Sequence, residues 1–307
     1  MTPRPRLRRI RFALENAGTN VVLALTGWIP TVRLIRLAAW LGAALGRRLP
    51  MARRRIDGNL QLVRPDMTAA ARGDLAAEVG AGLFMTGVEY LRLADLAARP
   101  EVMEIFGGAH VTGARAAGRP IIFVTAHFGA WEFIRLAARG LGAETAIIYR
   151  AFNNPRFDAM SQKLIAHAGT PVLHKGPAGA RGLLRHVAKG GAALILVDQR
   201  QTASPLIPFL GREAETATAA ADLALRFDAA LIPARVRRIE GGLRYDVAFE
   251  APVPHSDSVT MMAEVNARIG AWIDADPGQW FWLHRRWALR ARGIAARAAA
   301  QESARGR

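Results

Sequence analysis

The chain has 307 residues, 51% of them apolar, which excludes a disordered protein and provides a sizeable core for one large α/β domain or two small ones. It contains no cysteine, so disulfides and thiolate metal sites are excluded. The formal net charge of +17 at pH 7 favours an anionic partner, such as nucleic acid, an anionic membrane face or an acidic protein.

Arginine is concentrated in the first 55 residues, where Glu15 is the only acidic residue. Within this region an uncharged, largely apolar run extends from 17 to 32, before Arg33 and Arg36 interrupt it. A helix that spans a membrane needs about 20 apolar residues, so this run is too short. We therefore expect a helix, or two broken helices, that lies in the plane of a membrane interface.

Two tryptophans mark this N-terminal region, Trp28 inside the uncharged run and Trp40 after it. Both are placed like the aromatic anchors of a membrane surface. Residues 1–50 are thus predicted to be a membrane-associating helical segment, followed by the domain that carries the chemistry at 51–307. The alternative is an amphipathic helix that covers the core of that domain.

Helical patterns come first along the domain, and strands follow. Residues 51–104 are predicted to be helical, because Leu75, Val79 and Leu83 recur every four residues, as on one face of a helix. After residue 118, short apolar runs alternate with helical patterns. Strands are predicted at 119–127, 144–150, 171–174, 192–200, 230–238 and 243–250. Helices are predicted at 130–140, 156–168, 178–189, 216–228 and 259–275.

This alternation predicts an α/β fold with a central mixed, mostly parallel sheet flanked by helices. The adjacent glycines at 241 and 242 predict that the last two strands form an antiparallel hairpin. A stretch rich in proline and glycine, which ends at Arg212, is expected to be a loop.

His127 and Glu132 are the candidate catalytic residues. His127 ends the first strong strand, and open α/β sheets bind ligands at the carboxyl ends of their strands. Glu132 follows in the first turn of the next helix, so its carboxylate is expected to hold one imidazole nitrogen protonated and leave the other free to accept a proton. The nucleophile is then a hydroxyl of the substrate.

Two other interpretations of this pair stay open. The helix macrodipole alone favours a glutamate at a helix N-terminus, and a lone histidine at a strand end is commonly structural. His127 and Glu132 are also two potential metal ligands. However, no third ligand stands close in sequence, and the other histidines, His284 among them, form no metal-like cluster. We therefore expect neither a metal nor a cofactor.

Polar residues follow two further predicted strands. Asp198 and Gln199 end one of them, and Asn153 and Asn154 come shortly after another, which ends at Arg150. If these strands are parallel, their ends lie at the same edge of the sheet as the candidate base, so we expect these residues to contact the substrate. The alternative for the two asparagines is a turn, because Asn-Asn-Pro forms turns well.

These motifs, in this order, resemble the lipid A biosynthesis acyltransferase family, the lauroyl and myristoyl transferases of bacterial lipopolysaccharide assembly. The likeness covers roughly residues 15–290. The segment AHFGAWE (126–132) matches the family's His-x4-Asp/Glu motif. The other segments that carry the likeness are YRAFNNP (149–155), VDQR (197–200), PFLGREAETATAAADLALR (208–226) and WFWLHRRW (280–287).

The resemblance implies an acyltransferase at the cytoplasmic face of the bacterial inner membrane, with an acyltransferase domain at 51–307. Its donor would be an acyl thioester, usually acyl carrier protein, and its acceptor a hydroxyl of a lipid A precursor. His127 would be the general base, and Glu132 would stabilise the imidazolium. Backbone N–H groups at the start of the 130–140 helix would hold the oxyanion.

Three arginines are expected to bind the acceptor phosphates: Arg150, Arg285 and Arg286. For Arg285 and Arg286, the alternative is a solvated basic helix end. Tryptophans are dense between 272 and 287, where they would line an acyl groove, mark the membrane interface or belong to the core.

Two other functions remain as alternatives. The nearer one is an acyltransferase that acts on another membrane glycolipid or phospholipid, such as a mannosylated phosphoinositide. The other is a basic nucleic-acid-binding protein, which would explain the charge. The sequence has no recognised nucleic-acid-binding motif, so we expect no nucleic-acid partner.

Overall fold

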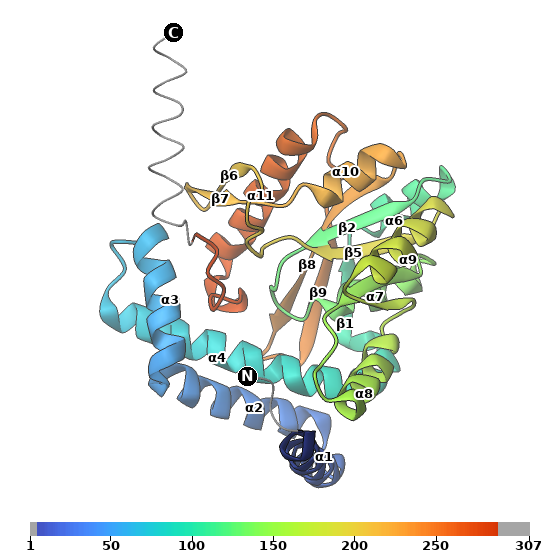
Figure 1. Cartoon of the computed structure of the whole chain (residues 1–307). Helices are drawn as coiled ribbons and strands as arrows, with labels where there is room; N and C mark the ends of the chain where they lie inside the picture. Colours follow the sequence, from blue (N-terminus) through green and yellow to red (C-terminus); the bar gives the residue numbers. More distant parts are fainter. Residues whose placement is uncertain (1–4, 288–307) are drawn as a thin grey trace.

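The computed structural model describes residues 5–287 and is built on one central sheet with helices packed on both faces (Figure 1). The sheet has the strand order β1-β9-β8-β2-β5-β3-β4. Its strands are β1 (Met103–Phe106), β2 (Ile121–Thr125), β3 (Thr145–Tyr149), β4 (Val172–His174), β5 (Ala192–Leu196), β8 (Ala230–Ile239) and β9 (Arg244–Phe249). The helices around it are α5 (Leu93–Ala97), α6 (Gly108–Ala116), α7 (Glu132–Gly140), α8 (Pro155–Ala166), α9 (Pro177–Ala188), α10 (Ala219–Arg226) and α11 (Ser258–Ala275).

The predicted fold class is confirmed. All neighbouring strands of the sheet run parallel except β8 and β9, which form the antiparallel hairpin expected from the two glycines. Gly241 and Gly242 have φ values of 68° and 83°, a left-handed conformation that glycine adopts without a steric penalty.

The central strand β2 is apolar in its first four residues because it is covered on both faces. Ile121 and Phe123 belong to the core cluster beneath α7, whereas Ile122 and Val124 belong to the cluster beneath α10 and α11. Successive side chains of a strand point to opposite faces, so a strand buried on both sides carries apolar residues at successive positions.

The prediction was wrong in two places. Residues 103–106 form the edge strand β1, paired with β9, instead of the end of a helical region. Within the expected loop before Arg212, β6 (Leu206–Phe209) begins a hairpin with β7 (Arg212–Glu215), turned by Leu210 and Gly211 at φ values of 49° and 74°. Both elements have strands of four residues, too short for an alternation pattern to be recognised.

The described chain begins with α1 (Pro5–Gly27), α2 (Thr31–Arg48), α3 (Pro50–Val63) and α4 (Ala69–Leu91), which come before α5 and the first strand. Helix α2 packs closely on α4 below the sheet (Figure 1). A Cβ atom on Gly80 would lie 2.2 Å from the carbonyl oxygen of Gly42, so only glycine permits this approach. Within residues 5–287, no helix combines the length and the apolar character that crossing a bilayer requires.

The division into residues 1–50 and 51–307 stays a prediction. Residues 1–4 and 288–307, at the outer ends of the two predicted parts, lie outside the described residues. Trp28 and Trp40 are 92% and 67% exposed, as aromatic anchors at an interface would be.

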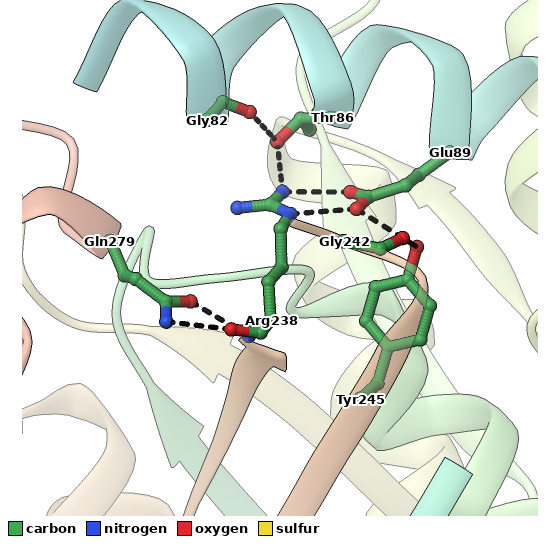
Figure 2. Close-up of polar contacts among 7 residues, drawn as sticks. All are labelled: Gly82, Thr86, Glu89, Arg238, Gly242, Tyr245 and Gln279. Atoms are coloured by element: carbon green, nitrogen blue, oxygen red, sulfur yellow. Dashed lines mark hydrogen bonds and ion pairs between the residues drawn. The ribbon is translucent and has the colours of Figure 1, made fainter. Parts of the chain in front are cut away.

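A buried ion pair ties α4 to the sheet (Figure 2). Arg238 on β8 donates from Nε and Nη2 to the two carboxylate oxygens of Glu89 on α4, each at 2.7 Å, and Nη2 also donates to Thr86. Tyr245 on β9 donates to Glu89 as well. Because the charges face each other with bidentate geometry, removing either one would leave the other buried without a partner.

Candidate active site

The register of the sheet brings His127 and Asp198 together. Strands β2 and β5 are parallel neighbours in which Thr125 is paired with Leu196. His127 and Asp198 each lie two residues beyond these partners, at the carboxyl edge of the sheet. The predicted convergence of these two strand ends is therefore what the structure shows.

Asp198 holds the imidazole of His127 directly. Its Oδ1 lies 2.9 Å from His127 Nδ1, and its Oδ2 accepts hydrogen bonds from the His127 backbone N–H at 3.0 Å and from Trp280 Nε1 at 2.8 Å. The side chain of Asp198 is fully buried, whereas that of His127 is 20% exposed. A buried carboxylate that is hydrogen-bonded to one ring nitrogen of a partly exposed imidazole is the arrangement of a general base with its orienting acid.

The charge on Asp198 is stabilised although the group is buried. Burial alone would raise its pKa, but the facing His127, the hydrogen bond from His127 and the donor from Trp280 outweigh burial and hold the pKa well below its usual range. Asp198 therefore stays ionised at neutral pH, and its carboxylate favours a proton on the Nδ1 nitrogen of His127. The Nε2 nitrogen is then the one free to accept a proton.

Glu132 does not take the place predicted for it. Its Oε1 accepts a hydrogen bond from Tyr90 at 3.0 Å, and its Oε2 accepts one from Arg135 Nη1 at 2.8 Å. Arg135 is fully buried and also donates hydrogen bonds to the carbonyls of Thr145, Ile165 and Gly169. Glu132 thus balances a buried arginine one turn along its own helix, and the imidazole is held by Asp198 instead.

The loop that carries His127 is fixed by residues 276–287, which follow α11 and are called the strap below. Residue 279 accepts a hydrogen bond from Gly129 N through its backbone oxygen, and Phe281 N donates to the carbonyl of His127, each at 2.9 Å. The Gln279 side chain in turn bonds both backbone groups of Arg238, at 2.8 and 3.1 Å (Figure 2). The strap therefore connects the candidate base to the buried ion pair of α4.

Only glycine fits at position 129 of this loop. Its φ is +56°, and a Cβ atom there would lie 1.8 Å from the carbonyl oxygen of Val236. The close approach of two backbones sets the direction in which the chain leaves His127 before α7 begins.

His284, near the end of the strap, lies against His127. The two ring centroids are 4.8 Å apart with the planes at 71°. Burial, and then the nearby His127, lower the pKa of His284 to about 4, although Asp198 opposes this shift. His284 is therefore neutral at physiological pH.

Among the described residues, His127, Asp198 and His284 form a group whose potential ligand atoms all lie within 4.8 Å of one another. The expectation that the remaining histidines form no such cluster was thus wrong for His284. The two oxygens of Asp198 already accept three hydrogen bonds, from His127 N, His127 Nδ1 and Trp280 Nε1. This arrangement fits a base with its orienting acid better than a metal centre.

The other residues predicted to bind substrate are dispersed. Gln199 is exposed beside the site, with Nε2 3.4 Å from His284 Nε2. Asn153 is exposed, whereas Asn154 is buried, caps α8 by accepting from Arg156 N at 3.2 Å and donates to Glu15 on α1. Asn154 therefore has the structural role that the turn interpretation gave it.

Arg285 and Arg286, near the C-terminus, also differ in burial. Arg285 is exposed, and its contact with a phosphate stays a prediction. Arg286 is fully buried and donates to the Glu215 carbonyl at 2.7 Å and to Thr216 at 2.6 Å, with its guanidinium over the ring of Phe209. Nη1 and Nη2 of Arg286 therefore have a structural role at the end of the β6–β7 hairpin.

An apolar cavity of about 920 Å³ lies beside the site, between α1, α2, α4 and α8. Its charged lining residues are Glu15 and Arg150, and most of the rest are aliphatic or aromatic. Tyr90 lines the cavity, and its ring contacts Trp131, which contacts His127, with centroid distances of 6.3 and 5.1 Å. A row of three rings therefore leads from the cavity to the imidazole.

Trp280 and His284 are members of the site that the sequence motifs did not indicate. Both lie in the WFWLHRRW segment, which was noted for its tryptophans and arginines. Trp272, Trp280, Trp282 and Trp287 are all buried, so they belong to the core, and one of them also donates to Asp198.

Residues 4–288 match a protein family described as bacterial lipid A biosynthesis acyltransferase. A lipid A biosynthesis lauroyltransferase of Escherichia coli (strain K12) is 28% identical over 288 residues, which cover 90% of this chain and 92% of that protein. A lipid A biosynthesis acyltransferase of Haemophilus influenzae is 23% identical over 266 residues, which cover 85% of this chain and 83% of that protein.

Proposed function

Because the chain belongs to the bacterial lipid A biosynthesis acyltransferase family and is therefore an acyltransferase, we propose that it moves a fatty acyl chain from acyl carrier protein to a hydroxyl of a lipid A precursor. The observation that carries the proposed chemistry is the hydrogen bond between the buried Asp198 and Nδ1 of His127. It leaves Nε2 as the proton acceptor at the sheet edge, and the acceptor hydroxyl supplies the nucleophile.

In the proposed reaction, the hydroxyl oxygen attacks the thioester carbonyl carbon while His127 Nε2 takes the hydroxyl proton. Asp198 stabilises the imidazolium that forms. The tetrahedral intermediate then expels the donor thiolate, which takes from His127 the proton that came from the hydroxyl. General base catalysis of this kind contributes about 10²–10⁴ in rate. Glu132 acts at a distance, by holding Arg135 and the start of α7 in place.

The apolar cavity supports a fatty acyl substrate. Its volume of about 920 Å³ lies within the range of about 300–1,000 Å³ that is usual for ligand pockets. An acyl chain in the cavity would contact Leu37, Val88 and Leu164, and its carboxyl end would lie toward Tyr90 and Trp131. Arg150 on the cavity lining and the exposed Arg285 are the candidate contacts for acceptor phosphates.

The exposed apolar side chains of α1 and α2 support a position on the cytoplasmic face of the inner membrane. Leu25, Trp28 and Trp40 are exposed, and Arg33, Arg36 and other arginines lie near them in the sequence. An amphipathic surface of this kind binds anionic lipid through buried apolar area together with electrostatic attraction. The same positive charge would attract an acidic acyl carrier protein.

The proposed function is tested by incubating the purified protein with lauroyl or myristoyl acyl carrier protein and a lipid A precursor, followed by mass spectrometry of the lipid. The wild type is expected to add the mass of one acyl chain, His127→Ala to add none, and the control His110→Ala on α6 to match the wild type. Failure of the wild type with both donors, or full activity of His127→Ala, would contradict the proposal. Replacing the carrier protein with acyl coenzyme A tests the choice of donor.

A further inference from the structure

His284 is held in the site by its backbone and by ring contacts. Asn59 on α3 is buried and donates from Nδ2 to the carbonyls of Trp282 and His284, at 2.6 and 2.7 Å. The Phe281 ring packs against the His284 ring with centroids 4.6 Å apart. The backbone and one side of the ring are thus fixed, and another side faces His127.

Gln199, beside His284, favours one position for the proton of the His284 ring. The nitrogen of the Gln199 amide lies 3.4 Å from Nε2 of His284. An amide nitrogen can only donate, so this contact favours Nε2 as the acceptor and Nδ1 as the nitrogen that carries the proton. Burial keeps this ring neutral, which means that His284 offers one N–H donor without carrying a positive charge that would compete for Asp198.

The reaction needs such a donor, because attack on the thioester turns the carbonyl oxygen into an oxyanion. The start of α7 was expected to supply backbone donors for it. However, Phe133 N already donates to the Ala130 carbonyl at 2.9 Å, and Ile134 N donates to the Trp131 carbonyl at 3.1 Å. Gly129 N is used by the strap. Three amides next to the candidate base are therefore committed within the protein.

We propose that His284 is a second catalytic residue, which donates a hydrogen bond from Nδ1 to the thioester carbonyl oxygen as that oxygen becomes an oxyanion. This inference rests on the proposed acyl transfer. In the attack step, the hydroxyl oxygen bonds to the carbonyl carbon, His127 takes the hydroxyl proton, and the carbonyl electron pair moves to the oxygen that faces His284. In the collapse step, the pair returns, the carbon–sulfur bond breaks, and the thiolate takes the proton from His127.

The test compares His284→Phe, which keeps a ring but loses the donor, with His284→Asn, which keeps a donor. Loss of one oxyanion donor is expected to lower kcat by about 10²–10³, with KM for both substrates changed by less than about threefold. His284→Asn is expected to recover at least about tenfold of this loss. The control is His110→Asn on α6, where kcat is expected to equal that of the wild type. If His284→Phe does not fold, as judged by circular dichroism, His284→Ala replaces it with the same expected loss.

A second measurement separates binding of the oxyanion from packing. A phosphonate analogue of the tetrahedral intermediate is expected to lose affinity for His284→Phe by a factor similar to the loss in kcat, whereas the affinity for the acyl donor stays unchanged. A kcat of the donor-free variant within threefold of the wild type, or equal losses in the Phe and Asn variants, would overturn the proposal. Absence of acyl transfer by the wild type would instead overturn the proposed function.

Discussion

Two buried carboxylates lie close to the candidate base, and they have different partners. Asp198, after β5, is fully buried and bonds Nδ1 of His127 at 2.9 Å. Glu132, at the start of α7, is 5% exposed and bonds the guanidinium of Arg135 at 2.8 Å. Glu132 neutralises an arginine, whose charge is permanent, whereas Asp198 faces a histidine, which gains and loses a proton. The comparison therefore assigns imidazole orientation to Asp198 and support of the loop to Glu132.

The largest expected effect is that of Asp198→Asn. Oδ2 accepts from two N–H groups, His127 N and Trp280 Nε1, so the amide oxygen of asparagine must take that position. The amide nitrogen then faces Nδ1 of His127 and donates to it, which moves the ring proton to Nε2 and leaves no base for the hydroxyl. We expect kcat to fall by about 10³–10⁴ in the acyl-transfer assay.

Asp228→Asn is the matched control for this change. Asp228 pairs with Arg119 at the surface, and its side chain is 78% exposed. Its replacement is expected to leave kcat unchanged. If Asp198→Asn retained more than a tenth of the wild-type kcat, the role of Asp198 would have to be abandoned.

Glu132→Gln is expected to act mainly on stability. The substitution removes the carboxylate charge and leaves the guanidinium of Arg135 buried without a counter-ion. The free energy of unfolding should therefore fall by about 3 kcal/mol in urea titrations. The folded variant should lose far less kcat than Asp198→Asn, because the tautomer of His127 is unchanged. A stable, fully folded Glu132→Gln with kcat as low as that of Asp198→Asn would reverse the comparison. Glu101→Gln, at an exposed pair with Arg99, should change neither quantity.

The last expected effect is a pH dependence of stability that comes from His284. Burial and His127 lower its pKa in the folded protein to about 4, below the ordinary value of 6.5. Between these values the unfolded chain binds a proton that the folded chain does not. This contribution to stability is therefore complete above pH 6.5 and is lost as the pH falls toward 4.

The contribution of His284 is measured as the difference between urea titrations of the wild type and of His284→Asn across this range. Its slope should not exceed about 1.4 kcal/mol per pH unit, the limit for one proton. Parallel pH profiles of the two proteins would show that the pKa of His284 is not lowered in the folded state.

The sheet was predictable because its central strands are buried on both faces and therefore appear as short apolar runs, such as 121–125 between a helix and a polar strand end. The hairpin of β8 and β9 was predictable from Gly241 and Gly242. The four-residue strands of β1 and β6 were not, because so few residues show no periodicity. Their pairing is set by distant partners.

The site was predictable in part, because it lies where parallel strands end. His127 and Asp198 are 71 residues apart, and both were placed at one sheet edge because parallel strands end there together. Which acid reaches the imidazole depends on β2 and β5 being neighbours, which does not follow from spacing along the chain. The same holds for His284, which the fold brings back to His127 from the other end of the domain. The pair of Glu132 with Arg135 has the i,i+3 spacing of neighbours on one helix, so the sequence did carry that signal.

The most direct test of the pairing between Asp198 and His127 is the ¹⁵N chemical shift of the histidine ring nitrogens at neutral pH, with His127 assigned from the spectrum of His127→Gln. The wild type and Glu132→Gln should both show a protonated Nδ1 and an unprotonated Nε2 on His127, whereas Asp198→Asn should show the reverse. A His127 tautomer that changes with Glu132→Gln and not with Asp198→Asn would contradict the pairing.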